Sequence, residues 1–228
     1  SNSKREDALD RMEELLKRME LGYHENREAD MRPNTISYVT LMDAFVRRDE
    51  NNAAVRAQAT VDRMTKLYSL GLGHVRPTKV IFDTLIHAWS KSKDANAATK
   101  AEKIFKWMEA QYKAGDDLVR PDETSMCMVL NAWANQARNG GAERAMQIYR
   151  HAESMSLEER GFQLSIMMPN ILIKAIARSQ DKKSIQKAES FLEQLERDYA
   201  SGKNSLRPDV TTYSSVINCC AYYDHEKG

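Results

Sequence analysis

The side chains best suited to catalysis or metal binding are few and scattered along the chain. It contains five histidines and three cysteines, the residues that most often serve as bases, nucleophiles or metal ligands. No histidine stands at ligand spacing from a cysteine, so the pattern indicates no metal site. His87 is expected to line a surface rather than act as a base, and no pair of carboxylates or activated nucleophile is recognisable. We therefore expect neither catalysis nor a cofactor in this segment.

Composition limits the partners that the chain could take. Hydrophobic residues make up 42% and charged residues 29% of the 228 residues, with a formal net charge of +1. This charge gives no whole-molecule argument for nucleic-acid binding, although a basic face remains compatible with it. The cysteines, Cys127, Cys219 and Cys220, form no even disulfide framework, which favours a reducing compartment. No apolar run is long enough to span a bilayer, so we expect no membrane partner.

The elements that position any functional side chain come from an internal repeat. Arg-Pro pairs recur about every 44 residues, a period typical of solenoids. Four of them are present, at Arg32-Pro33, Arg76-Pro77, Arg120-Pro121 and Arg207-Pro208. Another repeat begins without the pair, at Leu164. An alanine follows each of the first four starts at a constant distance, giving Ala57, Ala101, Ala145 and Ala188.

Each repeat reads as two helices. After the proline, apolar residues recur at helical spacing, as in Tyr38, Leu41, Met42 and Phe45, and predict a first helix. A polar break follows, and then a second helix carries the aligned alanine on its buried face. Four glycines lie where a helix stop in the left-handed conformation would favour glycine: Gly22, Gly71, Gly115 and Gly202.

The register predicts one continuous solenoid over residues 1–228. A half repeat covers 1–33, four complete repeats cover about 34–77, 78–121, 122–164 and 165–208, and a second half repeat covers 209–228. Because both ends fall partway into a repeat, we interpret the chain as a fragment of a longer protein. The predicted fold class is all-α, a solenoid of stacked antiparallel helical hairpins.

Two stretches carry a family resemblance. Residues 207–218 read Arg-Pro-Asp-Val-Thr-Thr-Tyr-Ser-Ser-Val-Ile-Asn, and residues 100–108 read Lys-Ala-Glu-Lys-Ile-Phe-Lys-Trp-Met. They resemble the pentatricopeptide repeat patterns Pro-Asp-x-x-Thr-Tyr-Asn-x-Leu-Ile and Glu-Ala-x-x-x-Phe-x-x-Met. The resemblance extends over nearly the whole chain and implies a right-handed, tetratricopeptide-like superhelix. HEAT repeats stay a minor alternative, because their period of about 40–47 residues also fits.

These repeats are longer than is usual for that family. The additional residues follow the second helix, as one more turn carrying Tyr68, Tyr112 or Tyr199 and then a loop led by glycine. The first helix, which carries recognition in the family, is expected to be unaffected.

The resemblance implies single-stranded RNA as the partner, with one base read per repeat. Base choice in the family depends on the residue after the first-helix aromatic and on the last residue of the repeat. Here those pairs are Val39/Thr78, Asp83/Asp122, Cys127/Ser165 and Asn170/Asp209, with Ser214 alone in the last half repeat. Asn170/Asp209 matches the uracil-preferring pair, whereas the other three match no common pair. The two acids Asp83 and Asp122 are also compatible with solvated helix ends.

Two further columns follow from the resemblance. The positions that sandwich bases are Ile36, Val80, Thr124, Met167 and Thr211, although packing between repeats would explain apolar residues there too. The phosphate-facing positions near the end of the first helix hold Arg47, Lys91 and Arg178, but Asn135 and Tyr222 in the third and fifth copies. These cations would be ordinary surface charges in another protein.

The resemblance implies a role in the processing, stability or translation of RNA in a mitochondrion or chloroplast. The alternative is a protein-binding scaffold that uses the same first-helix surface for a peptide. Some members of the family carry an endonuclease after their repeats, so a catalytic domain elsewhere in the protein is a further alternative.

Overall fold

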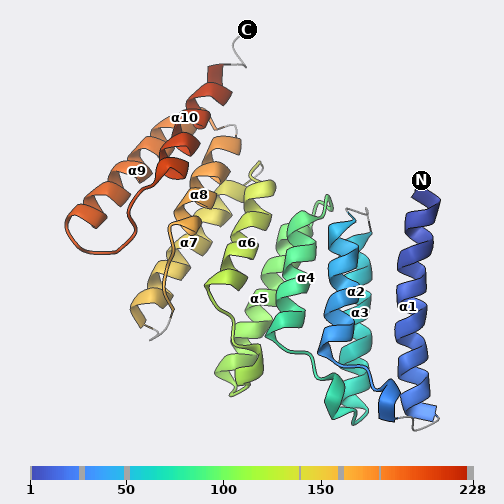
Figure 1. The fold of residues 1–228 in the computed structure, drawn as a ribbon. Coiled ribbons are helices and arrows are strands. Elements are labelled where there is room, and N and C mark those ends of the chain that lie inside the picture. The colour runs from blue at the N-terminus through green and yellow to red at the C-terminus, as the bar shows by residue number, and fades with distance from the viewer. Residues whose placement is uncertain are drawn as a thin grey trace. The chain divides into compact units, whose positions relative to one another are not determined.

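The computed structural model describes residues 2–25, 29–48, 52–138, 140–158, 162–179 and 181–224. All regular secondary structure in these residues is helical, and it forms the succession of paired helices expected of a helical-repeat solenoid (Figure 1). The predicted fold class is therefore confirmed. The chain divides into two compact units, an N-terminal unit of residues 1–121 and a C-terminal unit of residues 122–228.

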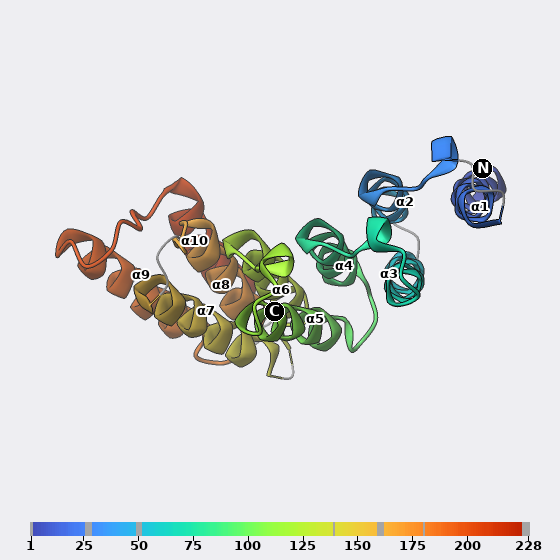
Figure 2. The same ribbon diagram turned by 90° about the horizontal axis from the view of Figure 1, so that it is seen from below.

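The N-terminal unit contains five α-helices and three short 3₁₀ helices among its described residues. The α-helices are α1 (Asn2–Glu25), α2 (Thr35–Arg47), α3 (Ala53–Ser69), α4 (Lys79–Lys91) and α5 (Ala97–Lys113). The first helices α2 and α4 pack against each other, and each packs against its own second helix, α3 or α5. Seen along the helices, α2 and α4 lie on one side of this unit and α3 and α5 on the other (Figure 2).

The C-terminal unit repeats this arrangement with α6 (Glu123–Asn135), α7 (Gly141–Glu158), α8 (Met167–Arg178), α9 (Ser184–Ala200) and α10 (Val210–Asp224). The first helices α6, α8 and α10 pack in succession, α6 on α8 and α8 on α10. The second helices α7 and α9 pack behind their partners. In both units, side chains of successive first helices therefore come close together on one face.

The core is built from the residue columns that the repeat predicts. The four aligned alanines are fully buried, which lets the paired helices approach closely. Tyr38, Leu41, Met42 and Phe45 are the buried residues of α2. The aligned residues of these repeats thus occupy equivalent buried positions in their helices.

The additional residues form a defined connector in the three repeats where a glycine follows the second helix. Gly71, Gly115 and Gly202 have φ angles of +94°, +100° and +71°, so the predicted left-handed helix stops are confirmed. After Gly71 and Gly115 the chain makes one 3₁₀ turn, η2 (Gly73–Val75) or η3 (Asp117–Val119). Val75 and Val119 then anchor these connectors in the core.

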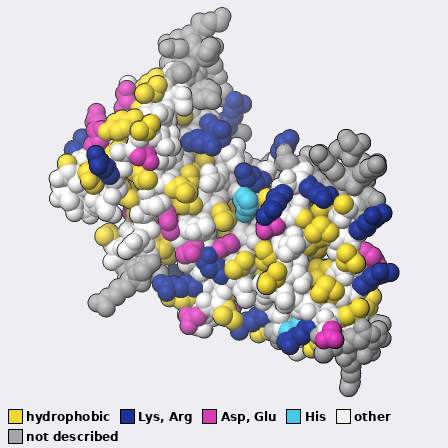
Figure 3. All heavy atoms as spheres, in the orientation of Figure 1, with side chains coloured by type: hydrophobic (Ala, Val, Ile, Leu, Met, Phe, Trp, Pro, Cys, Tyr) yellow, Lys and Arg dark blue, Asp and Glu magenta, His cyan; other side chains and the backbone are white. Residues whose placement is uncertain are grey.

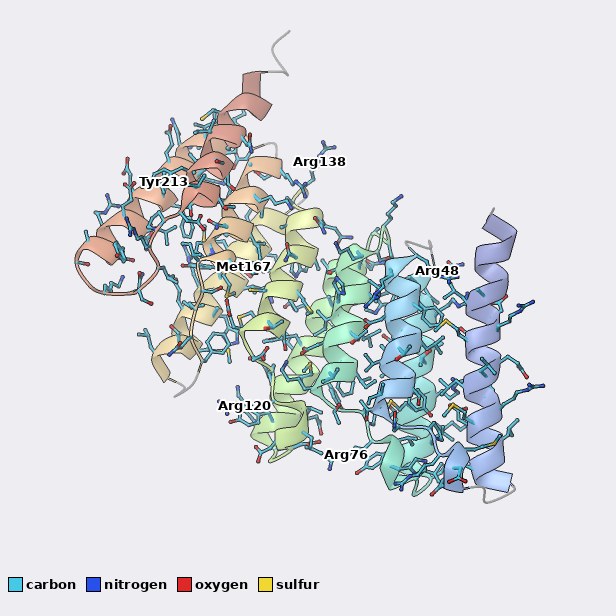
Figure 4. All side chains as sticks on the ribbon, in the orientation of Figure 1. Arg48, Arg76, Arg120, Arg138, Met167 and Tyr213 are labelled. Atoms are coloured by element: carbon cyan, nitrogen blue, oxygen red, sulfur yellow. The ribbon has the colours of Figure 1, made fainter. Side chains whose placement is uncertain are left out.

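Each Arg-Pro arginine of the N-terminal unit stacks on the tyrosine before it. The Arg76 guanidinium lies 5.6 Å from the Tyr68 ring centroid, and Arg120 lies 5.1 Å from that of Tyr112. Arg76 also forms an ion pair of 2.8 Å with Asp116 in the next connector, and Figure 4 shows Arg76 and Arg120 at this end of the helices. The added length is therefore ordered by cation–π contacts.

The prediction for Gly22 was wrong. Helix α1 (Asn2–Glu25) continues through this residue, which is absent from the glycines with positive φ. A Cβ atom at Gly22 would lie 2.3 Å from the sulfur of Met31 in η1 (Ala29–Met31). Glycine here allows the chain to fold back closely against the helix, a tertiary contact that the repeat pattern does not encode.

Candidate nucleic-acid interface

The fourth repeat brings its two predicted base-reading residues together. Asn170 on α8 donates a hydrogen bond from Nδ2 to Oδ1 of Asp209, which immediately precedes α10, at 3.2 Å. The Oδ1 atom of Asn170 is buried and has no hydrogen-bond partner in the described protein. The opposite amide orientation would place two oxygen atoms against each other, so this orientation is the consistent one. Buried acceptors are almost always satisfied, so a donor brought within reach of this oxygen would be stabilising.

Asp209 is held in position by the start of the helix that follows it. Its Oδ1 accepts hydrogen bonds from the backbone nitrogen of Thr212 at 2.8 Å and from the Thr212 hydroxyl at 2.9 Å. These two bonds, followed by the one from Asn170, lower the pKa of Asp209 below its usual value. Asp209 thus caps α10 as an ionised carboxylate while it orients the Asn170 amide.

The third repeat holds its pair in a different way. Ser165 donates from its backbone nitrogen to Oε1 of Glu123 at 3.1 Å, and its hydroxyl donates to the same oxygen. The Cys127 thiol donates to this oxygen at 3.7 Å. Burial, and then the charge of Glu123, raise the pKa of Cys127 to about 12, so the thiol stays protonated. Glu123, and not a direct contact, joins Cys127 to Ser165.

In the second repeat, Asp83 is neither solvated nor at a helix end. It lies in the second turn of α4, its side chain is buried, and it forms an ion pair with Lys79 one turn earlier. The alternative that Asp83 is a solvated helix-terminal acid is therefore wrong for this residue. Asp122, in the other unit, does lie at a helix start, where its side chain accepts from the backbone nitrogen of Ser125 at 3.1 Å.

The remaining predicted reading positions are Val39, Thr78 and Ser214, and the structure gives fewer side-chain hydrogen bonds for them. Val39, half-buried on α2, offers only an aliphatic side chain, and Thr78 precedes α4 without a side-chain capping bond. Ser214 is exposed on α10. Beside it, Tyr213 donates from its hydroxyl to Glu196 on α9 at 2.8 Å (Figure 4).

The predicted sandwiching positions are exposed to solvent. Ile36 is 73% exposed, Val80 53% and Met167 58%, and Thr124 and Thr211 are also exposed. Packing between repeats would have buried these side chains, so that alternative does not account for them in either unit. Three of these side chains are large, apolar and solvent-exposed, and each lies at the start of a first helix. Such side chains are suited to contact a ligand.

The three predicted phosphate-facing cations, Arg47, Lys91 and Arg178, are exposed near the ends of first helices. In the C-terminal unit Arg178 donates from Nη1 to Oδ1 of Asn135 at 3.1 Å, so equivalent positions of successive repeats lie within reach of each other. Lys and Arg side chains are visible at the edge of the N-terminal unit where α2 and α4 end (Figure 3). The side chain of Tyr222, the fifth member of this column, lies outside the described residues.

Sequence reasoning missed Lys79 and Glu123. Each stands four residues before a reading position, so the two side chains share a helix face, a signal that the sequence does contain. The bonds from Ser165 to Glu123 join residues far apart in the chain and needed the structure. Among the described residues, no three His, Cys, Asp or Glu side chains gather into a group able to hold a metal. None of the described helices has both the length and the apolar character to cross a membrane.

A comparison with known protein families finds a match in the part of the chain that contains the fourth repeat. Residues 155–223 match the family model of the pentatricopeptide repeat domain. The match supports the predicted family resemblance over these residues. The matched stretch runs from the end of α7 into α10 and includes both Asn170 and Asp209 of the pentatricopeptide-like fourth repeat. No curated protein sequence matches the chain.

Proposed function

We propose that this chain binds single-stranded RNA along the first-helix face of its repeats, one base to a repeat. The observation that carries the proposal is the hydrogen-bonded pair of Asn170 and Asp209 with its unsatisfied Asn170 oxygen. Uracil carries an N–H at the ring position where cytosine carries a bare nitrogen. The Asn170 oxygen would accept from uracil and repel cytosine, so the fourth repeat is expected to select uracil.

Two other columns support the same ligand. A base read by Asn170 would lie between Met167 of its own repeat and Thr211 of the next, both of which are exposed. Stacking of bases on such side chains tolerates any sequence, because every base has a π face. The exposed cations at the ends of the first helices would contact phosphates and position the strand without reading it.

We further propose that the biological role is the processing, stabilisation or translation of transcripts in a mitochondrion or chloroplast. The support for this finer assignment is the family resemblance. Catalysis forms no part of the proposal, because the reading pairs, the apolar positions and the cations are all equipped for binding.

A protein-binding scaffold is the second candidate. It is favoured by the exposed Ile36 and Val80 of the N-terminal unit, which an apolar peptide could cover, and by a net charge of only +1. RNA and peptide binding differ in their dependence on salt, because only RNA releases counterions when its phosphates are neutralised.

The test is fluorescence anisotropy with a labelled pool of random single-stranded RNA over a range of salt concentrations. We expect the triple variant Arg47→Glu, Lys91→Glu, Arg178→Glu to lose most of its affinity. Neutralising three fewer phosphates should also reduce the slope of log Kd against log salt by about 2, at roughly 0.7 for each contact with a single strand.

A matched control changes three exposed cations of second helices, Lys103→Glu, Arg150→Glu and Arg197→Glu, and alters the net charge equally. It should bind nearly as the unaltered chain does. If the unaltered chain binds no RNA pool even at low salt, the RNA proposal is wrong and the scaffold is favoured.

A further inference from the structure

The residue one helical turn before a predicted reading position differs between repeats. The difference changes which hydrogen-bonding groups each repeat offers to a ligand. In the fourth repeat it is Ile166, which has no polar group, and Asn170 is left to pair with Asp209. In the third repeat it is Glu123, whose carboxylate takes the hydrogen bonds of both reading residues. In the second it is Lys79, which pairs with the reading residue Asp83.

Consequently, the third repeat does not present Cys127 and Ser165 to a ligand as donors. Cys127 is 5% exposed, and its thiol proton points to Glu123. The Ser165 hydroxyl and backbone nitrogen are directed to the same Glu123 oxygen, Oε1. All of the hydrogen bonds of Glu123 in the described protein fall on this one oxygen, which leaves Oε2 as an acceptor at the half-buried surface of the repeat.

We infer that Glu123 is the base-selecting residue of the third repeat, and that it rejects uracil in favour of bases that carry an exocyclic amino group. The inference rests on the proposed function. Adenine, cytosine and guanine each offer an amino group as a donor, and a carboxylate accepts from such groups, as Asp and Glu do from cytosine. Uracil has no amino group, and its single N–H lies between two carbonyl oxygens that a carboxylate repels.

The exposed side chains around Glu123 are consistent with this role. Thr124 and Met167, the sandwiching positions of the third and fourth repeats, are both exposed and would lie on either side of the base. Adjacent repeats would then have opposite preferences, with uracil favoured by Asn170 and excluded by Glu123. The unit would favour a uracil whose neighbour on one side is not uracil.

The test compares two unstructured RNAs, a uridine dodecamer and an alternating uridine–cytidine dodecamer. In the alternating RNA every uracil placed on Asn170 has a cytosine as its neighbour, whereas the uridine dodecamer places uracil on Glu123 in every register. We expect the unaltered chain to bind the alternating RNA about tenfold more tightly. Glu123→Gln should reduce this ratio to about twofold or less, because an amide can also donate to the uracil carbonyls.

Glu123→Gln keeps an oxygen acceptor for Ser165, so the packing around the site is retained, and thermal unfolding checks this. Glu189→Gln on α9 is exposed, removes the same charge and should leave the tenfold ratio unchanged. An unaltered ratio in Glu123→Gln, while Asn170→Ala changes the preference for uracil, would overturn the inference and leave the proposed function standing. Absence of binding to either RNA would overturn the proposed function, and the inference with it.

Discussion

The third and fourth repeats share one scaffold but display different chemistry. Both place one predicted reading residue in the first turns of a first helix and the second just before the next first helix. In the fourth repeat the two residues bond directly, and the amide oxygen of Asn170 has no partner among the described residues. In the third repeat a carboxylate from the preceding turn joins them and takes over as acceptor. The difference teaches that the residue one turn before a predicted reading position determines how the two residues of the pair are hydrogen-bonded.

The largest expected effect comes from giving the fourth repeat the feature that distinguishes the third. Ile166→Glu would place a carboxylate one turn before Asn170, where it would accept from the amide and repel Asp209. We expect the preference for uracil to fall about tenfold, since a hydrogen bond to a charged group contributes about 1.5–3 kcal/mol. Anisotropy with alternating uridine–cytidine RNA and a cytidine dodecamer measures this change.

Ile166→Leu is the matched control, because it keeps an apolar side chain of equal size. It should retain the uracil preference. An Ile166→Glu variant that discriminates as well as the unaltered chain would show that this position does not influence the reading pair.

A smaller effect is expected from substitutions of Asp209, which separate its role as the N-cap of α10 from its role in orienting the Asn170 amide. Asp209→Ser keeps a good N-cap for α10 but removes the carboxylate that orients Asn170. We expect its free energy of unfolding to stay within a few tenths of a kcal/mol while the uracil preference falls. Asp209→Ala should lose both, with the cap costing about 1 kcal/mol.

Thermal or chemical denaturation measures the first quantity and anisotropy the second. Equal losses of uracil preference in both variants, with unequal stability, are the expected pattern. If Asp209→Ser reads uracil as well as the unaltered chain, the carboxylate serves α10 alone.

Much of the fold could be predicted from the sequence because each repeat encodes it locally. The aligned alanines are all fully buried, and Gly71, Gly115 and Gly202 end their helices in the left-handed conformation. Gly22 escaped the pattern, because its role depends on Met31 packing against the helix, which no spacing reveals. The division of the chain into two units after Pro121 is likewise absent from the regular register.

The sequence predicted which residues form the candidate site, but not their burial, ion pairs or hydrogen bonds. Alignment with the family gave the place of Asp83, but its burial and its ion pair with Lys79 depend on the surroundings of α4. The spacing of Glu123 and Cys127 signals a shared face, yet the bond from Ser165 requires the fold of the whole repeat. Charge and hydrogen bonding at these positions are tertiary properties.

The most direct test of uracil reading by the fourth repeat measures the affinity of the unaltered chain and of Asn170→Ala for two RNAs, alternating uridine–cytidine RNA and a cytidine dodecamer. We expect the unaltered chain to bind the uridine-containing RNA about tenfold more tightly, and Asn170→Ala to bind the two RNAs equally. An unaltered chain that does not distinguish them, or an Asn170→Ala variant that still does, would contradict the claim that the fourth repeat reads uracil.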